Sequence, residues 1–135
     1  MDNQKLIELA KDARKLSYSP YSRFAVGAAL ETRSGRVYLG ANIENASYPL
    51  CMCGERNAIY NALMNGEKGE DILRLAIVAD SKEVCSPCGA CRQVISELMD
   101  QEADIILGNL DGKIRICKVK DLIPFAFSGK DLGVK

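Results

Sequence analysis

Two short stretches, about one supersecondary unit apart, determine how this chain can fold and what it can bind: Cys53-Gly54-Glu55 and Pro87-Cys88-Gly89-Ala90-Cys91. The chain contains no histidine, so a zinc site here would use thiolates. Three thiolate ligands leave one position of a tetrahedral ion open, which is typical of catalytic zinc. The pattern therefore predicts a catalytic zinc ion held by Cys53, Cys88 and Cys91, with one ion per chain and an acidified water in the open position.

The sequence around these cysteines predicts two helices that begin at them. Apolar residues at helical spacing follow Cys53 as far as Gly66, and a similar pattern follows Cys88. Because Cys88 and Cys91 are three residues apart, both side chains are expected on one side of their helix. The partial positive charge at a helix N-terminus favours thiolates.

The residues next to the cysteines supply the remaining chemistry. Glu55 lies two residues beyond Cys53, where a carboxylate can take a proton from a metal-activated water and deliver it elsewhere. Three thiolates and one Zn²⁺ leave a formal charge of about −1. Arg56 and Arg92 each follow a cysteine directly, and Arg56 is the predicted charge compensator at the metal.

Other interpretations of these cysteines stay open from the residues alone. A Cys-x-x-Cys pair is also found in structural zinc knuckles and in redox pairs. The run Cys85-x-x-Cys88-x-x-Cys91 resembles part of an iron–sulfur motif but lacks the fourth Cys followed by Pro. Cys51 or Cys85 could close a four-thiolate structural zinc site. Otherwise Cys51, Cys85 and Cys117 are predicted to be buried or semi-buried thiols that act as small hydrophobic residues.

The order of predicted elements indicates an α/β domain in three layers, with a mixed five-stranded sheet flanked by helices. A helix is expected over residues 3–16 and is broken at Tyr18-Ser19-Pro20-Tyr21. Residues 122–127 are expected to cap the structure. The predicted strands are residues 24–30, 37–41, 73–79, 103–107 and 114–119.

Length and charge restrict the class of protein. The 135 residues suit one domain, residues 1–135. Lys+Arg and Asp+Glu both number 18, which argues against a nucleic-acid partner. No apolar stretch is long enough for a membrane span, and the polar N-terminus lacks a signal-peptide core. A cytoplasmic location is therefore expected, where six cysteines favour metal binding over disulfides.

A Cys₃ zinc, a non-ligand Glu and a Pro-Cys-x-x-Cys segment together are typical of zinc deaminases. The chain resembles the small, homotetrameric cytidine deaminases over nearly its whole length. Beyond the cysteine stretches, the resemblance rests on residues 21–30, on the polar segment Asn42 to Pro49, and on Leu122-Ile123-Pro124-Phe125-Ala126-Phe127.

The resemblance implies a role for individual residues. Glu55 would be the proton shuttle, and Asn42 and Glu44 would bind ribose hydroxyls. Phe24 would lie against the pyrimidine ring, and the backbone N–H of Gly54 would contact the base. Tyr48 and Phe127 would reach a neighbouring subunit's pocket. This family usually has Ala at position 54 and Thr at position 57, so Gly54 and Asn57 are departures.

The function implied by the resemblance is hydrolysis of cytidine and 2′-deoxycytidine to the uridine products and ammonia, in pyrimidine salvage. A deaminase of a cytosine-containing antibiotic such as blasticidin S would share the metal stretches, although Asn42 and Glu44 favour a ribose. A polynucleotide-editing deaminase is disfavoured by the neutral charge. A non-catalytic zinc-binding module would not need an unpaired acid at Glu55.

Overall fold

A computed structural model describes residues 1–134. Its centre is a five-stranded sheet in the order β2-β1-β3-β4-β5. The strands are β1 (Val26–Thr32), β2 (Val37–Ala41), β3 (Ile72–Ala79), β4 (Asp104–Asn109) and β5 (Ile114–Lys118). β3 and β4 are parallel and the other neighbouring pairs are antiparallel. The prediction of a mixed five-stranded sheet is confirmed.

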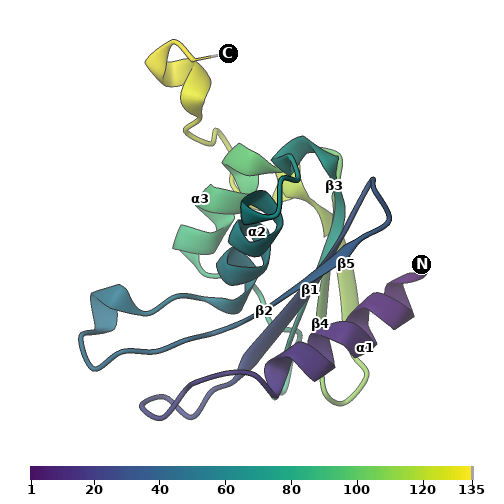
Figure 1. The fold of residues 1–135 in the computed structure, drawn as a ribbon, viewed down its shortest axis with the longest axis vertical. Helices are drawn as coiled ribbons and strands as arrows, with labels where there is room; N and C mark the ends of the chain where they lie inside the picture. Colours follow the sequence, from purple (N-terminus) through teal and green to yellow (C-terminus); the bar gives the residue numbers. More distant parts are fainter. Residues whose placement is uncertain (135) are drawn as a thin grey trace.

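The helices make the layers on either side of this sheet (Figure 1). Helix α1 (Asn3–Arg14) covers one face, and α2 (Gly54–Met64) and α3 (Gly89–Leu98) lie together on the other. Leu6, Ile7 and Ala10 of α1 pack against the sheet. The larger core lies under α2 and α3 and includes Ile59, Ile77 and Ile95. Within residues 1–134, none of the helices has the length and apolar composition that crossing a membrane requires.

The first predicted strand begins too early, which matters for the site. Residues 24 and 25 lie before β1, and the strand runs on to Thr32 instead of ending at residue 30. Arg23 has a left-handed backbone, with φ of 56°, and the Phe24 N–H donates to Ser22 Oγ at 3.0 Å. A chain that turns in this way cannot continue as a strand, so Phe24 lies in a loop. The helix predicted over 3–16 likewise ends at Arg14, and Leu16 is exposed.

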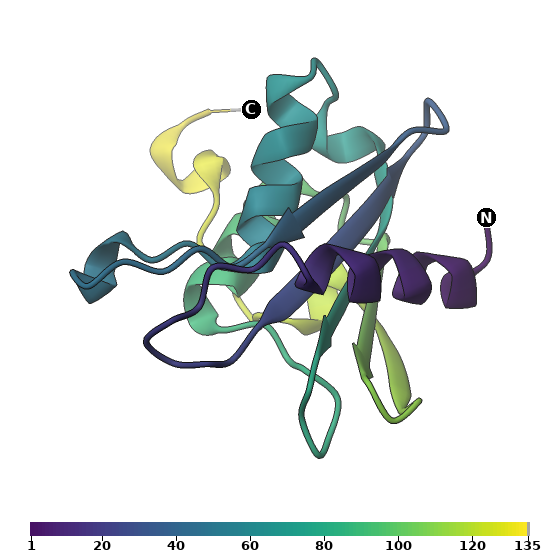
Figure 2. The same ribbon diagram turned by 60° about the horizontal axis from the view of Figure 1, so that its bottom comes forward.

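Two segments extend away from the layers. The first is the loop between β2 and α2, residues 42–53, which includes the short helix η1 (Tyr48–Leu50). The second is residues 122–134, which include η4 (Gly129–Leu132) and are drawn in yellow in Figure 1. Figure 2 shows them leaving the body in separate places. We call them the loop arm and the C-terminal arm.

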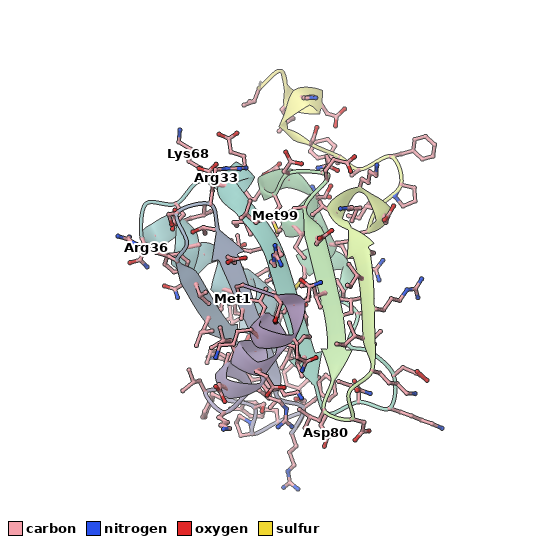
Figure 3. The ribbon with its side chains drawn as sticks, turned by 90° about the vertical axis from the view of Figure 1, so that its right-hand side faces the viewer. Met1, Arg33, Arg36, Lys68, Asp80 and Met99 are labelled. Atoms are coloured by element: carbon pink, nitrogen blue, oxygen red, sulfur yellow. The ribbon has the colours of Figure 1, made fainter. Side chains whose placement is uncertain are left out.

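The prediction that residues 122–127 cap the structure is right only at its start. Leu122 is buried and Ile123 packs on the core. Phe125 and Phe127 are exposed, and Figure 3 shows the arm standing clear of the sheet. Large apolar side chains therefore lie on a projecting segment instead of covering the core.

Candidate metal centre and active site

Three cysteines meet where α2 and α3 begin. Cys53 and Cys88 are the N-cap residues of α2 and α3, and Cys91 is buried in the first turn of α3. Their sulfur atoms all lie within 4.8 Å of one another. The Cys53 and Cys88 sulfurs are 3.8 Å apart. Two thiolates on one tetrahedral zinc, each at about 2.3 Å from it, are separated by about 3.8 Å. The arrangement therefore fits a zinc ion.

The other cysteines lie outside this group. Among the described residues, the mutually close ligand atoms belong to Cys53, Cys88 and Cys91. The Cys51 sulfur accepts from the Asn45 N–H at 3.3 Å. Cys85 and Cys117 pack against the core, and burial raises the pKa of the Cys85 thiol to about 11. The four-thiolate interpretation is therefore not supported, and three thiolates would leave one position of a tetrahedral ion open.

Without a bound metal ion, Cys53 and Cys91 share a proton. Hydrogen bonding from Cys91 lowers the pKa of Cys53 to about 5, with a further contribution from Arg56. The same Cys53–Cys91 hydrogen bond, together with burial, raises the pKa of Cys91. One sulfur thus ionises with the help of its neighbour's proton. A metal ion bound by the thiolates would take the place of this shared proton.

Glu55 is a buried carboxyl beside the cluster. It lies in the first turn of α2, and only 4% of its surface is exposed. Burial raises the pKa of Glu55, and the charge of Cys53 raises it further. A buried carboxyl with a raised pKa, next to a metal site, is suited to accept and release a proton during a reaction.

The two arginines that follow the cysteines behave differently. Arg56 Nη2 donates to the Cys53 sulfur at 3.3 Å, and this contact raises the pKa of the guanidinium. The position agrees with the predicted charge compensation. Arg92 instead donates to three neutral oxygen atoms, of Pro87, Leu122 and Ser86. Arg92 is therefore not a second compensator at the sulfurs.

Asn42 and Glu44 lie together at the base of the loop arm and organise it. Asn42 Oδ1 accepts from the Val26 N–H at 2.9 Å and from Ser17 Oγ at 2.5 Å. Glu44 accepts from the backbone N–H groups of Tyr21 and Ser22 and from the Ser22 hydroxyl, and the Ser22 hydroxyl hydrogen bond is the largest cause of the lowered pKa of Glu44.

Ser17 and Ser22 were not identified from the sequence. The only signal there was their position around the predicted break at Pro20. Their partners are 25 and 22 residues away. A cavity of about 290 Å³ opens here, and the residues that line it are Tyr21, Ser22, Glu44, Tyr48 and Cys51.

The remaining predicted residues divide between the site and the arms. Phe24 is 42% exposed, and its carbonyl accepts from Asn42 Nδ2 at 2.8 Å, so it adjoins the Asn42 loop and is not a core residue. Gly54 is buried as the first residue of α2. Tyr48, in the loop arm, and Phe127, in the C-terminal arm, are exposed. The Tyr48 ring lies at the Glu44 cavity of its own chain, with its centroid 6.3 Å from that of Tyr21, whereas Phe127 does not line that cavity.

The family model for the cytidine and deoxycytidylate deaminase zinc-binding region matches residues 1–106. The chain belongs to this deaminase family. A cytidine deaminase of Halalkalibacterium halodurans is 49% identical over 133 residues, which are 98% of this chain and 99% of the relative. One of Sporosarcina psychrophila is 46% identical over 133 residues, covering 98% and 96%.

Solved structures of the deaminase family share the fold. The crystal structure of cytidine deaminase from Burkholderia pseudomallei has a TM-score of 0.92 and 46% identity, covering 94% of this chain and all of that chain (100%). The cytidine deaminase structure from Mycobacterium tuberculosis has a TM-score of 0.81 and 39% identity, covering 94% and 98%. As a member of a zinc-binding deaminase family, the chain has three grouped thiols that can hold the ion.

Proposed function

We propose that this deaminase hydrolyses cytidine and 2′-deoxycytidine to uridine and 2′-deoxyuridine with release of ammonia, as a step of pyrimidine salvage. The observation that carries the proposal is the buried Glu55 beside a group of three thiols, which would leave one position of a tetrahedral zinc ion open. A non-catalytic zinc module has no use for such an acid. The two relatives at 46% and 49% identity are named cytidine deaminases.

Each residue of the centre has a proposed task. Cys53, Cys88 and Cys91 would hold one zinc ion, which, when bound, supplies an activated water at neutral pH. The Glu55 carboxylate would take the proton of the attacking water, deliver it to N3 of the pyrimidine, and assist departure of the amine from C4. Arg56 would neutralise the negative charge that three thiolates leave at the metal.

The nucleoside would be held by residues at the base of the loop arm. Glu44 would accept hydrogen bonds from ribose hydroxyls, and Asn42 would donate to them. Phe24 would lie against the ring, and the Gly54 N–H would contact the base. Glu44 is already fixed by donors from the 21–22 turn, so it would bind without much loss of side-chain entropy.

We also propose that residues 1–135 form a single deaminase domain that works in the cytoplasm as a homotetramer, without nucleic-acid or membrane partners. The support for assembly is the exposed apolar surface of the two arms, because projecting apolar side chains mark contact sites. Tyr48 and Phe127 would each complete a neighbouring subunit's site. The support for a reducing location is that all six cysteines are free thiols.

The test combines metal analysis with a substrate panel. Purified protein should contain about one zinc per chain and should deaminate cytidine and deoxycytidine in an ultraviolet absorbance assay. Free cytosine should be a poor substrate, because the polar groups that bind ribose would be left unpaired. Blasticidin S is the fourth substrate: turnover of this compound but not of cytidine would establish the antibiotic deaminase instead. If zinc-loaded protein turned over none of the four substrates, the remaining interpretation would be a non-catalytic zinc-binding module.

A further inference from the structure

Arg92 occupies an unusual position in the first turn of α3. It follows the buried Cys91, yet its guanidinium points back past the start of its own helix. Nε donates to the Pro87 carbonyl at 2.9 Å, and Nη2 donates to Ser86 Oγ at 2.6 Å. Nη1 donates to the Leu122 carbonyl at 3.0 Å. One planar group therefore joins the helix, the segment that leads into Cys88, and the start of the C-terminal arm.

Charge pairing does not explain this placement. All three recorded acceptors are neutral oxygens. A cation near a helix N-terminus also lies at the positive end of the helix dipole, which is unfavourable. The three hydrogen bonds instead require the planar, fixed set of N–H donors of a guanidinium, which the ammonium group of a lysine lacks.

The segment that Arg92 holds needs an external anchor. Residues 80–88 between β3 and α3 form no helix or strand. The start of this loop is attached to β4 by Asn109 Nδ2, which donates to the Ser81 and Lys82 carbonyls, and its middle by the Cys85 N–H, which donates to the Gly108 carbonyl at 3.1 Å. Pro87 has no N–H to donate. The Cys88 carbonyl accepts from the Arg92 N–H at 2.9 Å as α3 begins, and the bonds that hold the two residues before Cys88 come from the Arg92 guanidinium.

We propose that Arg92 is a positioning residue of the metal centre, which places the Cys88 sulfur against those of Cys53 and Cys91 and ties the metal loop to the C-terminal arm. The inference rests on the proposed function in one respect, namely that the cluster holds zinc. Because coupling between two sites is reciprocal, zinc occupancy and the order of residues 122–127 are linked through this guanidinium.

The experiment compares zinc affinity in wild type, Arg92→Gln, Arg92→Lys and Gln93→Ala by competition with a chromophoric chelator. Arg92→Gln should bind zinc about 10- to 100-fold more weakly, the usual effect of losing a residue that orients a ligand. Arg92→Lys should not restore the affinity, because it keeps the charge and loses the fork. Gln93→Ala is the matched control, since Gln93 Nε2 contacts only the arm, at the Phe127 carbonyl, 2.9 Å away.

Two further readouts separate positioning from general stability. Cobalt-substituted Arg92→Gln should show altered thiolate-to-metal absorption bands, while Gln93→Ala should keep the wild-type bands. In wild type, zinc removal should speed hydrogen exchange in residues 122–127. In Arg92→Gln that exchange should already be fast and should no longer respond to zinc.

The outcomes distinguish the two proposals. If wild type binds no zinc, the proposed function and this inference both fall. If wild type binds zinc and Arg92→Gln binds it equally well, with unchanged cobalt bands, only the inference falls. Should Arg92→Gln fail to fold, Ser86→Ala removes one bond of the same guanidinium and should weaken zinc binding by about 2- to 10-fold, the effect of one net hydrogen bond. Unchanged affinity in that variant would also overturn the inference.

Discussion

At the scale of single residues, Glu55 has a property that a purely structural side chain would not retain. Its carboxyl is buried, and burial raises its pKa, so its ionised form costs stability when no cation is near. We expect Glu55→Gln to bind zinc normally and to lose about 10²–10⁴-fold in turnover. The zinc-free variant should melt roughly 3–5 °C above zinc-free wild type, for a gain of about 1 kcal/mol. Near-normal turnover would eliminate the proposed shuttle.

Cys53 and Arg56 give a second expectation at this scale. The pKa of Cys53 is lowered to about 5 by Cys91 and, less strongly, by Arg56. In zinc-free protein the thiolate therefore predominates above about pH 5, so Cys53 alkylation should already be near its maximum at pH 6. Arg56→Gln should raise this pKa, slow alkylation at pH 6 and leave it little changed at pH 8. Peptide mass spectrometry would follow Cys53, with Arg36→Gln, at an exposed turn, as the control.

The sequence predicted the cysteine group and its acid well because each member lies at a fixed offset from a helix start. Cys53 and Cys88 cap their helices, and local spacing is enough to aim them at one point. The supports of the proposed sugar site could not be predicted in this way. Ser22 binds Glu44, which is 22 residues away in the sequence. The turn that brings them together depends on the left-handed backbone of Arg23, and an arginine in the sequence does not predict that conformation.

At the scale of elements, the approach of α2 to β2 depends on Gly40. A Cβ at this position would lie 2.3 Å from the Ala58 nitrogen and 2.3 Å from the Gly54 carbonyl oxygen, both backbone atoms. We expect Gly40→Ala to lower the free energy of unfolding by about 1–3 kcal/mol or more, measured in urea. Gly54→Ala is the matched variant, since its closest contact is 3.1 Å from the Val26 carbonyl; it should be nearly neutral. Equal losses would mean that the two elements separate freely.

The β1–β2 hairpin and the end of α2 are joined by Glu67. Its Oε2 accepts from Ser34 Oγ and Thr32 Oγ1 at 2.8 Å each and from the Tyr38 hydroxyl at 3.0 Å. These bonds, that of Ser34 first, lower the pKa of Glu67 from 4.5. A lowered pKa stabilises the fold above pH 4.5, and this contribution is lost as the pH falls below that value.

Glu67→Gln should therefore be less stable than wild type at pH 7, and the difference should shrink at pH 4 and below. Chemical denaturation at the two pH values measures it, with the exposed Glu70→Gln as control. A difference that does not depend on pH would assign the effect to packing instead of charge.

Element order was predictable because hydrophobic periodicity is local, whereas some boundaries depended on tertiary contacts. The strand predicted to begin at Phe24 begins at Val26, because the Phe24 N–H and carbonyl are engaged by Ser22 and Asn42. The apolar run from Leu122 looks like a core segment. Only its first residues pack on the core, because other side chains already fill the space between the sheet and helices α1, α2 and α3.

At the scale of the whole molecule, the exposed arms suggest that the fold of one chain is not the working unit. Phe125 and Phe127 on the C-terminal arm and Tyr48 on the loop arm are exposed, and Figure 1 shows both arms standing away from the layers. Burial of a Phe side chain is worth about 1.5–3 kcal/mol, so an assembly that covers these rings gains considerable stability. A single sequence does not predict which apolar side chains a neighbouring subunit covers, because an exposed Phe and a buried Phe look alike in the sequence.

Shared sites can be tested by mixing two chains that are each impaired in a different way. Phe127→Ala should weaken nucleoside binding if its ring completes a neighbour's pocket, while Glu55→Gln should abolish turnover in its own site. In a mixed oligomer, a Phe127→Ala chain supplies an intact Glu55, and a Glu55→Gln neighbour supplies the missing ring. Co-refolding the two variants should therefore restore activity above the sum of the separate proteins, rising with the fraction of mixed contacts.

The matched control is a mixture of Glu55→Gln with the double variant Glu55→Gln/Phe127→Ala, in which no site has an intact acid and no activity should return. Light scattering gives the mass of each preparation. A monomeric wild type, or co-refolded variants no more active than their sum, would refute the shared pocket. Neither result would contradict the proposed roles of the three cysteines and Glu55, because those residues lie together within one chain. The arms would then need another partner to explain their exposed rings.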